Sequence, residues 1–388
     1  MVYSELTEEI FSAYYACRKN KRNTLNALEF EVHLERNLFS LIDEIHSGCY
    51  IPGKSIAFIV NRPVKREVFA ADFRDRVVHH WLIGKLNPLF ESFFINDSYA
   101  CRVAKGTHFG IKRIAQFIAE CSDQYRVDTY ILKLDIQGFF MHINRRLLHE
   151  RLTAFISAYY KGDDIALLLS ITQKIVFANP AQYCFIKGNR ADWKGLPANK
   201  SLFFSPPDCG LPIGNLTSQV FANFYLHAMD VYITQSMGIS YYGRYVDDFI
   251  LIHRDKEVLK SVIPNLNRFL AEDLHLTLHP KKIFMQHYVR GVTFLGAVIK
   301  PGRIYIGNRT KGNFYQAIKR QNQCIKLRIP NDEEVKAFQS AMNSYLGLLR
   351  HYKTYRIRKK AIQSILSNSW NKYVVADEQF LKFSRVPL

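Results

Sequence analysis

Apolar and polar positions alternate with two different periods along this chain, and the two periods predict two kinds of element. From residue 25 to 45, and again from 335 to 349, apolar side chains recur every three or four positions, which predicts amphipathic helices. Residues 240–252 and 292–299 are short and rich in β-branched and aromatic residues, which predicts β-hairpins. The pattern predicts an α+β fold with an antiparallel sheet covered by helices.

Two adjacent acidic residues interrupt the apolar run 240–252. Asp247 and Asp248 follow Tyr245 and Val246 and precede four apolar residues, so the pair is predicted to lie at the turn of the hairpin. Two adjacent carboxylates repel each other and raise each other's pKa. A bound divalent cation removes that repulsion. A solvated Asp-Asp turn is the simpler alternative for a motif this short.

A third acidic residue favours the cation. Residues 130–134 form an apolar strand pattern that ends on Asp135, and Gly138 and two aromatic residues follow. Two-metal phosphoryl transfer uses carboxylates from separate segments to hold two cations a few Å apart. Asp135 alone is most simply a polar residue at a strand end. Together with Asp247 and Asp248, it predicts a catalytic metal site.

In chain order these segments resemble the polymerase motifs of a reverse transcriptase, and the resemblance extends from about residue 51 to about residue 366. Residues 135–140 resemble motif A, residues 210–219 motif B, and Tyr245 to Asp248 motif C. The resemblance implies a right-hand polymerase fold with fingers, palm and thumb, and DNA synthesis from dNTPs on an RNA template. It also implies two Mg²⁺ ions, with Mn²⁺ as a substitute, bound by Asp135, Ile136, Asp247 and Asp248.

Motif B departs from the common pattern at two positions. Most reverse transcriptases have Gln before its Gly and Pro after its Ser, whereas this chain has Ile213 and Gln219. This form resembles the reverse transcriptases of diversity-generating retroelements, which copy a template RNA with frequent errors at adenines. Ile213 offers only van der Waals contact, and a site held by shape discriminates less than one held by hydrogen bonds. Ile213 is therefore expected to contribute to low fidelity, although it can equally be a packed strand residue.

The resemblance implies further nucleotide-binding residues. Phe140, five residues after Asp135, corresponds to the side chain that excludes a ribose 2′-hydroxyl, although most single Phe residues are simply core. The basic turn before residue 67 corresponds to the hairpin that grips the triphosphate, whose negative charge requires cations. A solvated basic turn is the alternative. The expected dNTP contacts are Arg62, Lys65, Arg66, Phe140, Ile213, Gly214 and Gln219.

Other residues are expected to hold the template and primer. Residues 292–299 resemble the primer grip, in which Gly296 allows close backbone approach. Lys282 or Lys281 of motif D is expected to act as the general acid near pyrophosphate, and the sequence does not choose between them. The expected template and primer contacts are Arg102, Lys105, Tyr245, Leu295, Gly296, Arg350 and Lys353.

The charge of the chain agrees with a polyanionic partner. There are 53 Lys and Arg against 34 Asp and Glu, a net charge of +19. Residues 303–388 contain 17 basic and 5 acidic residues, a net of +12, in a segment that resembles the thumb. Asn331 and Glu334 are spaced as the N-cap and N3 residues of its helix. Basic residues after that helix are expected to follow the duplex backbone: Arg350, Lys353, Arg356, Arg358, Lys359 and Lys360.

Length and the remaining composition limit the organisation of the chain. We expect an N-terminal helical extension (1–50), fingers (51–125), a palm (126–300) with an insert at about 154–207, and a thumb (301–388). No further nuclease or protease module is expected. The seven Cys are scattered without a Cys-x-x-Cys pair, which fits a reducing cytoplasm, and the apolar runs are too short to cross a membrane.

The resemblance implies a structured template RNA and a small basic accessory protein that forms an oligomer, in a bacterial or phage-encoded system. Two other functions stay open. One is a reverse transcriptase of the phage-defence or retron type. The other is a catalytically inactive, maturase-like RNA-binding protein, against which the three retained Asp residues argue.

Overall fold

The computed structural model describes residues 2–19, 24–61 and 64–386. They form two compact units, each assembled from separate chain segments. The first unit contains residues 1–104, 133–250 and 257–284, and the second contains residues 105–132, 251–256 and 285–388. These units cut across the predicted boundaries of fingers, palm and thumb, and that functional division stays a prediction. The predicted α+β class with antiparallel sheets is confirmed.

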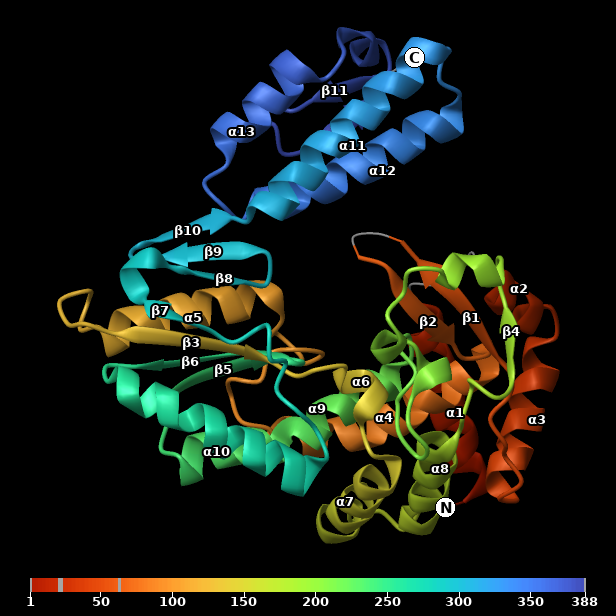
Figure 1. The fold of residues 1–388 in the computed structure, drawn as a ribbon. Coiled ribbons are helices and arrows are strands. Elements are labelled where there is room, and N and C mark those ends of the chain that lie inside the picture. The colour runs from red at the N-terminus through yellow and green to blue at the C-terminus, as the bar shows by residue number, and fades with distance from the viewer. Residues whose placement is uncertain (1, 20–23, 62–63, 387–388) are drawn as a thin grey trace. The chain divides into compact units, whose positions relative to one another are not determined.

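Four helices form the beginning of the first unit, as the helical spacing predicts for its N-terminal part. They are α1 (Tyr3–Arg18), α2 (Leu25–Val32), α3 (Leu34–His46) and α4 (Phe73–Phe93), and α1 packs along α4 (Figure 1). The Asp72 side chain accepts a hydrogen bond from the Arg74 amide and so caps the start of α4. Trp81 and Lys85 of α4 both donate to Glu9 of α1, which fixes the two helices side by side.

The first unit also contains a three-stranded sheet, two strands of which lie between α3 and α4 in the chain. Strands β1 (Ser55–Val60) and β2 (Arg66–Ala70) pair antiparallel, and β4 (Cys184–Ile186) pairs parallel with β1. The sequence analysis did not predict β4, which is only three residues long and lies in the expected insert. The buried Glu67 carboxylate accepts hydrogen bonds from Trp193 Nε1 (2.6 Å), Ser201 Oγ (2.7 Å) and the Leu202 amide. The loop of the insert is therefore fixed to β2.

A four-stranded sheet carries the predicted motifs A and C. Its order is β5-β6-β3-β7, and β3, β6 and β7 each contribute residues to both units. In the first unit, the helices that follow these strands are amphipathic or largely buried. Motif B includes the start of one of them, α9. The bounds are β3 (Tyr130–Asp135), α6 (Phe139–His142), α7 (Arg145–Tyr159), α8 (Ile165–Phe177), η1 (Arg190–Trp193), η2 (Ala198–Lys200), η3 (Leu202–Phe204), α9 (Leu216–Val231), η4 (Tyr232–Ser236), β5 (Tyr241–Tyr245), β6 (Asp248–His253), α10 (Lys256–Leu274) and β7 (Phe284–His287).

The second unit combines a small sheet with helices. Helix α5 (Thr107–Cys121) packs against β9 of the sheet β10-β9-β8, and α11 lies beside α12 (Figure 1). Asn331 and Glu334 form the predicted capping box at the start of α12, and Val335, Phe338 and Met342 are buried as predicted. The bounds are η5 (Tyr288–Arg290), β8 (Val292–Phe294), β9 (Ala297–Lys300), β10 (Arg303–Ile306), α11 (Asn308–Leu327), α12 (Asp332–Leu349), α13 (Tyr355–Lys360), η6 (Ala361–Ile365), η7 (Asn368–Lys372), β11 (Val374–Ala376) and β12 (Phe383–Arg385).

Within the described ranges, none of the helices combines the length and the apolar character needed to cross a membrane.

Candidate active site

The predicted hairpin is present, and its turn is short. Strand β5 ends at Tyr245, Val246 and Asp247 form the turn, and Asp248 is the first residue of β6. Val246 has φ +55°, a conformation that a β-branched residue adopts only under strain. The Val246 carbonyl accepts a hydrogen bond from Arg244 Nη1 (3.1 Å), which holds the turn in that conformation.

Arg244 and Asp230 form an ion pair behind this turn that the sequence analysis missed. Both side chains are completely buried. Arg244 donates to Asp230 through Nε (2.7 Å) and Nη2 (2.6 Å), and the Tyr242 hydroxyl donates to the same carboxylate (2.6 Å). The pair ties helix α9 to strand β5. An Asp within an apolar helix, followed by an Arg within an aromatic strand, was the available sequence signal.

Two lysines contact the predicted catalytic carboxylates. Lys282 Nζ lies 2.8 Å from each oxygen of Asp135, which ends β3. Lys133 Nζ lies 3.0 Å from Asp248 Oδ2. The other oxygen of Asp248 is buried and has no hydrogen-bond partner among the described residues. Because an unsatisfied buried carboxylate oxygen is costly, this atom favours an additional electropositive partner.

The three carboxylates are close enough for their charges to raise the pKa of Asp247 and Asp248. Burial, then the negative charges of Asp135 and Asp248, raise the pKa of Asp247 to about 6, although Lys282 acts in the opposite direction. Burial also raises the pKa of Asp248, against the opposing charge of Lys133, and Asp135 adds to the rise. The two lysines therefore leave the carboxylate group short of positive charge.

The geometry for a metal is not assembled in this structure. No group of three or more His, Cys, Asp or Glu side chains in residues 2–19, 24–61 and 64–386 is arranged to hold a metal ion. The donor set nevertheless suits a hard cation, because it consists of carboxylates with one unsatisfied buried oxygen. The Ile136 side chain is buried and apolar, so only its backbone carbonyl is a possible ligand.

Phe140 and Ile213 lie against the same apolar cluster, formed by Ala57, Phe69, Met141 and Leu202. The Phe69 amide donates to the Ile213 carbonyl (2.8 Å). Ile213 lies in a turn before α9 and not in a strand. Gly214 has φ +129°, and a Cβ there would lie 2.8 Å from the Phe69 carbonyl oxygen, so this position requires Gly.

Three other predicted residues lie near the hairpin turn. The exposed Gln219 accepts a hydrogen bond from Cys101 Sγ (3.0 Å). Burial raises the pKa of Tyr245, Cys101 adds to that rise, and the positive charge of Arg66 lowers it. Arg66, at the exposed start of β2, therefore lies within electrostatic range of the Tyr-Val-Asp-Asp segment. Cys101, a residue that the sequence pattern did not single out, thus lies near both Gln219 and Tyr245.

The remaining predicted residues of the first unit are placed differently. Lys65 Nζ donates to the Lys194 carbonyl (2.7 Å), within the fixed insert loop. The prediction that Arg102 faces phosphates needs correction, because its side chain is only 4% exposed and bonds to Glu91 and to the carbonyls of Ile95 and Ser98. Arg62 lies outside the described residues.

The second unit holds the other predicted template and primer residues. Leu295 and Gly296 form the β8–β9 turn, with φ +49° and +82°, as the primer-grip pattern predicts for a hairpin. Lys105 lies over the Phe109 ring. Arg350 and Lys353 are exposed, whereas Arg358, also expected on the surface, is buried and donates to the carbonyls of Gln379 and Phe380. Its predicted contact with a nucleic-acid backbone therefore needs correction.

Comparisons with known proteins agree with the motif pattern. Residues 65–299 match the family described as "Reverse transcriptase (RNA-dependent DNA polymerase)". The chain is 22% identical to Protein YkfC of Escherichia coli (strain K12) over 306 residues, which are 70% of this chain and 73% of that protein.

Solved telomerase structures are more distant. Apo telomerase of Candida tropicalis has a TM-score of 0.49 and 12% identity, over 82% of this chain and 57% of that chain. Telomerase of Candida albicans in complex with a TWJ fragment of telomeric RNA has a TM-score of 0.42 and 13% identity, over 80% and 56%. The chain thus spans little more than half the length of these telomerases. Because the family match covers more than half of the chain and includes all three Asp residues, this chain belongs to the reverse transcriptase (RNA-dependent DNA polymerase) family and has its right-hand polymerase fold.

Proposed function

We propose that this chain copies a template RNA into DNA from dNTPs at the carboxylate group of Asp135, Asp247 and Asp248. The proposal rests on one observation. In this member of the reverse transcriptase family, the negative charge of the three carboxylates is not fully balanced by positive charge. Two of them have raised pKa values, and one keeps a buried oxygen that has no hydrogen-bond partner in residues 2–19, 24–61 and 64–386. Such a group favours added cations, as phosphoryl transfer requires.

The metal ligands in this proposal are Asp135, Asp247, Asp248 and the backbone carbonyl of Ile136. Mg²⁺ bound there would neutralise the triphosphate and activate the primer 3′-hydroxyl. Lys282 holds Asp135 in the absence of a cation and is the better candidate for the general acid, because its Nζ already contacts both oxygens of that carboxylate. A lysine beside the reacting phosphates can donate a proton to pyrophosphate.

The nucleotide contacts proposed here are grouped around motifs A, B and C. Arg66 provides a cation near Tyr245 for the triphosphate. Phe140 excludes the ribose 2′-hydroxyl, with Ile213 beside it on the same cluster. Gly214 and Gln219 complete the set. For the template and primer we propose Lys105, Tyr245, Leu295, Gly296, Arg350 and Lys353.

For the subtype, we propose an error-prone enzyme of a diversity-generating retroelement, working with a structured RNA and a basic accessory oligomer. Its support is the motif B sequence, with Ile213 where a hydrogen-bonding Gln is usual and Gln219 after the Ser. The half-buried Ile213 side chain packs on an apolar cluster and has no polar atom with which to fix the incoming base.

Primer extension on an RNA template with dNTPs and Mg²⁺, followed by sequencing of the product, tests both the polymerase function and the retroelement subtype. Product made by the wild type and lost in Asp247→Asn supports the polymerase. Errors concentrated opposite template adenine, and reduced in Ile213→Gln, support the retroelement subtype. Accurate product keeps the polymerase and favours the defence or retron class. No product, even with native RNA and accessory protein, favours an inactive RNA-binding protein.

A further inference from the structure

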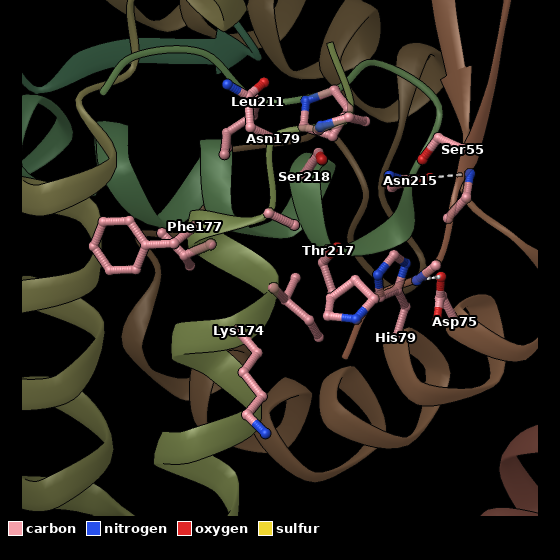
Figure 2. A pocket seen from close by; sticks show the side chains of 18 of the residues that line it. Ser55, Asp75, His79, Lys174, Phe177, Asn179, Leu211, Asn215, Thr217 and Ser218 are labelled. Carbon is pink, nitrogen blue, oxygen red and sulfur yellow. Dashed lines mark hydrogen bonds between the residues drawn. The ribbon is translucent and has the colours of Figure 1, made fainter. Parts of the chain in front are cut away.

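A cavity of about 380 Å³ lies in the first unit, and no catalytic carboxylate lines it. Its walls come from residues 50–55, from helix α4, from the C-terminal end of α8 and from the motif B segment that opens α9 (Figure 2). The volume falls in the range of about 300–1,000 Å³ typical of small-molecule sites. The walls are mainly apolar, with Ile51, Pro52, Val176, Phe177, Leu211 and Phe221 among them.

Three hydroxyl-bearing residues line this cavity. Ser55, Thr217 and Ser218 are 6%, 2% and 3% exposed. Figure 2 shows Thr217 and Ser218 on the helix that borders the cavity. Because a hydroxyl group can both donate and accept a hydrogen bond, these residues give the mainly apolar walls a few polar groups that can orient a ligand.

The rim of the cavity carries exposed aromatic rings and a lysine. Tyr183 lines the cavity, and its side chain is 61% exposed. Lys54 Nζ lies 4.0 Å from the centre of the Tyr183 ring and 4.9 Å from that of Phe185, which is 59% exposed on strand β4. Exposed aromatic rings beside a cation are the means by which proteins bind single-stranded nucleic acids, because bases stack on the rings and phosphates approach the cation.

We propose that this cavity takes one unpaired base of a single-stranded RNA. The neighbouring bases stack on Tyr183 and Phe185, and the phosphate between them lies near Lys54. A base suits the interior because it is planar, uncharged and able to bond with the three hydroxyls. Phosphates stay outside, since the lysine that lines the cavity, Lys174, donates its Nζ to the carbonyls of Gly48 and Tyr50. The positive charge of Lys54 at this rim favours a polyanion over an uncharged partner.

This site rests on the proposed function and extends it to the path of the template strand. Ser218 and the exposed Gln219 are neighbours on helix α9. A base held in the cavity would therefore fix the RNA strand to the same helix that carries the proposed nucleotide contact. The cavity would act as an anchor for single-stranded RNA before the strand reaches the carboxylates.

The test is an abasic scan with a short unstructured RNA that carries a fluorescent label. Each position is replaced in turn by an abasic sugar, and affinity for the full-length protein is measured by anisotropy at fixed salt. In the wild type, we expect one position at which loss of the base weakens binding about fivefold or more, as for a stacked base. Ala178→Leu, which fills the cavity from the end of α8, is expected to weaken binding of the intact RNA and to abolish the abasic effect.

Surface variants and a matched control complete the test. Tyr183→Ala and Lys54→Met are expected to weaken RNA binding without affecting folding, whereas Tyr15→Ala, which removes a ring of similar exposure (63%) on α1, is expected to have no effect. A flat abasic profile with tightly bound RNA, or wild-type affinity in both Tyr183→Ala and Ala178→Leu, would overturn the site. Primer extension by the wild type on the same RNA distinguishes failure of this site from failure of the proposed function. A protein that extends the primer but shows a flat abasic profile keeps the polymerase function and lacks only the base-binding site.

Discussion

Two groups of charged residues meet at the β5–β6 hairpin, one of them through helix α9, and only one group has its charges balanced. Asp230 and Arg244 are entirely buried, and the Asp230 carboxylate accepts hydrogen bonds from Arg244 and Tyr242. Asp247 and Asp248, a few residues after Arg244, have raised pKa values, and one Asp248 oxygen has no hydrogen-bond partner in the part of the chain that the structure describes. The complete group positions the turn through Arg244 and the Val246 carbonyl, and the incomplete group keeps its capacity to bind a cation.

The comparison shows what the balance of charges in a buried group indicates about its role. A pair whose donors and acceptors are matched contributes to the fold, and removing one partner leaves an uncompensated charge. A group with excess negative charge is destabilising by itself and therefore indicates a binding partner. The following changes test this distinction, from the largest expected effect to the smallest.

Asp247→Asn is expected to separate activity from stability. Primer extension falls on the order of 10³-fold or more, because a ligand for charge-stabilising cations is lost. The metal-free protein becomes no less stable to urea, because a buried carboxylate whose pKa is raised to about 6 has been neutralised. Activity measurements and urea unfolding check the two parts. A stability loss as large as that of Asp230→Asn would contradict the comparison.

Asp230→Asn, in contrast, is expected to destabilise the folded protein. It leaves Arg244 buried without a counter-charge, so the free energy of unfolding falls by about 3–5 kcal/mol. The matched control is Asp208→Asn, which breaks an exposed pair with Arg146 (45% and 70% exposed) and is expected to cost less than about 1 kcal/mol. Urea unfolding of both variants measures the difference, and equal losses would show that burial of the Asp230 pair has no special role.

Lys282→Ala compares the two candidate lysines. It removes the cation that contacts both oxygens of Asp135, and a loss of primer extension on the order of 10²-fold is expected if Lys282 donates a proton. Lys281→Ala, next to it in sequence, is the control and is expected to keep most of the activity. The pH–rate profile gives a second readout, since loss of a general acid removes the alkaline limb. The opposite ranking of the two variants would assign the role to Lys281.

Asp75 is another buried carboxylate, and its hydrogen-bond donors are neutral. It accepts hydrogen bonds from the Tyr50 hydroxyl and the Gly53 amide, and burial raises its pKa to about 6 from 3.8. The folded protein therefore binds a proton more tightly than the unfolded chain, and stability from this group falls as the pH rises from about 4 to about 6. Over that range the wild type is expected to lose up to about 3 kcal/mol relative to Asp75→Asn. Urea unfolding across pH measures it, and parallel curves would exclude the effect.

Val246→Gly has the smallest expected effect. Relief of the positive φ at Val246 is expected to offset the greater freedom of Gly in the unfolded chain, so stability changes by no more than about 1 kcal/mol. Primer extension is expected to fall, since Asp247 is less firmly held. Urea unfolding and primer extension check both effects, and full activity would show that the Arg244–Val246 bond is enough to fix the turn.

Local patterns in the sequence predicted much of this molecule. The hairpin at Asp247 and the capping box at Asn331 depend on neighbours within a few positions, whereas the role of the three Asp residues rests on their resemblance to known polymerase motifs and stays a prediction. The Glu67–Trp193 bond joins residues that are 126 positions apart, and the pairing of β4 with β1 is equally remote, so no local pattern reveals them. The burial of Arg102 and Arg358 could not be predicted from local patterns either.

A basic side chain in a sequence looks the same whether it is exposed to phosphates or bonded to buried carbonyl groups. Arg102 and Arg358 belong to the second kind, and Arg350 and Lys353 remain exposed. Burial depends on the tertiary fold, which decides which basic residues remain accessible to a nucleic acid.

The division of the second unit into separate segments also has a consequence for synthesis on the ribosome. Helix α5 emerges with residues 105–132, but the segment that contains its partner strand β9 begins at residue 285. At about 5–20 residues per second, the helix waits roughly 8–30 s for that strand. Its apolar side chains, Ile111, Ile114, Phe117 and Ile118, lack this packing surface for the whole interval. The yield of folded protein is therefore expected to depend on how well chaperones shield this one helix while the chain is still being made.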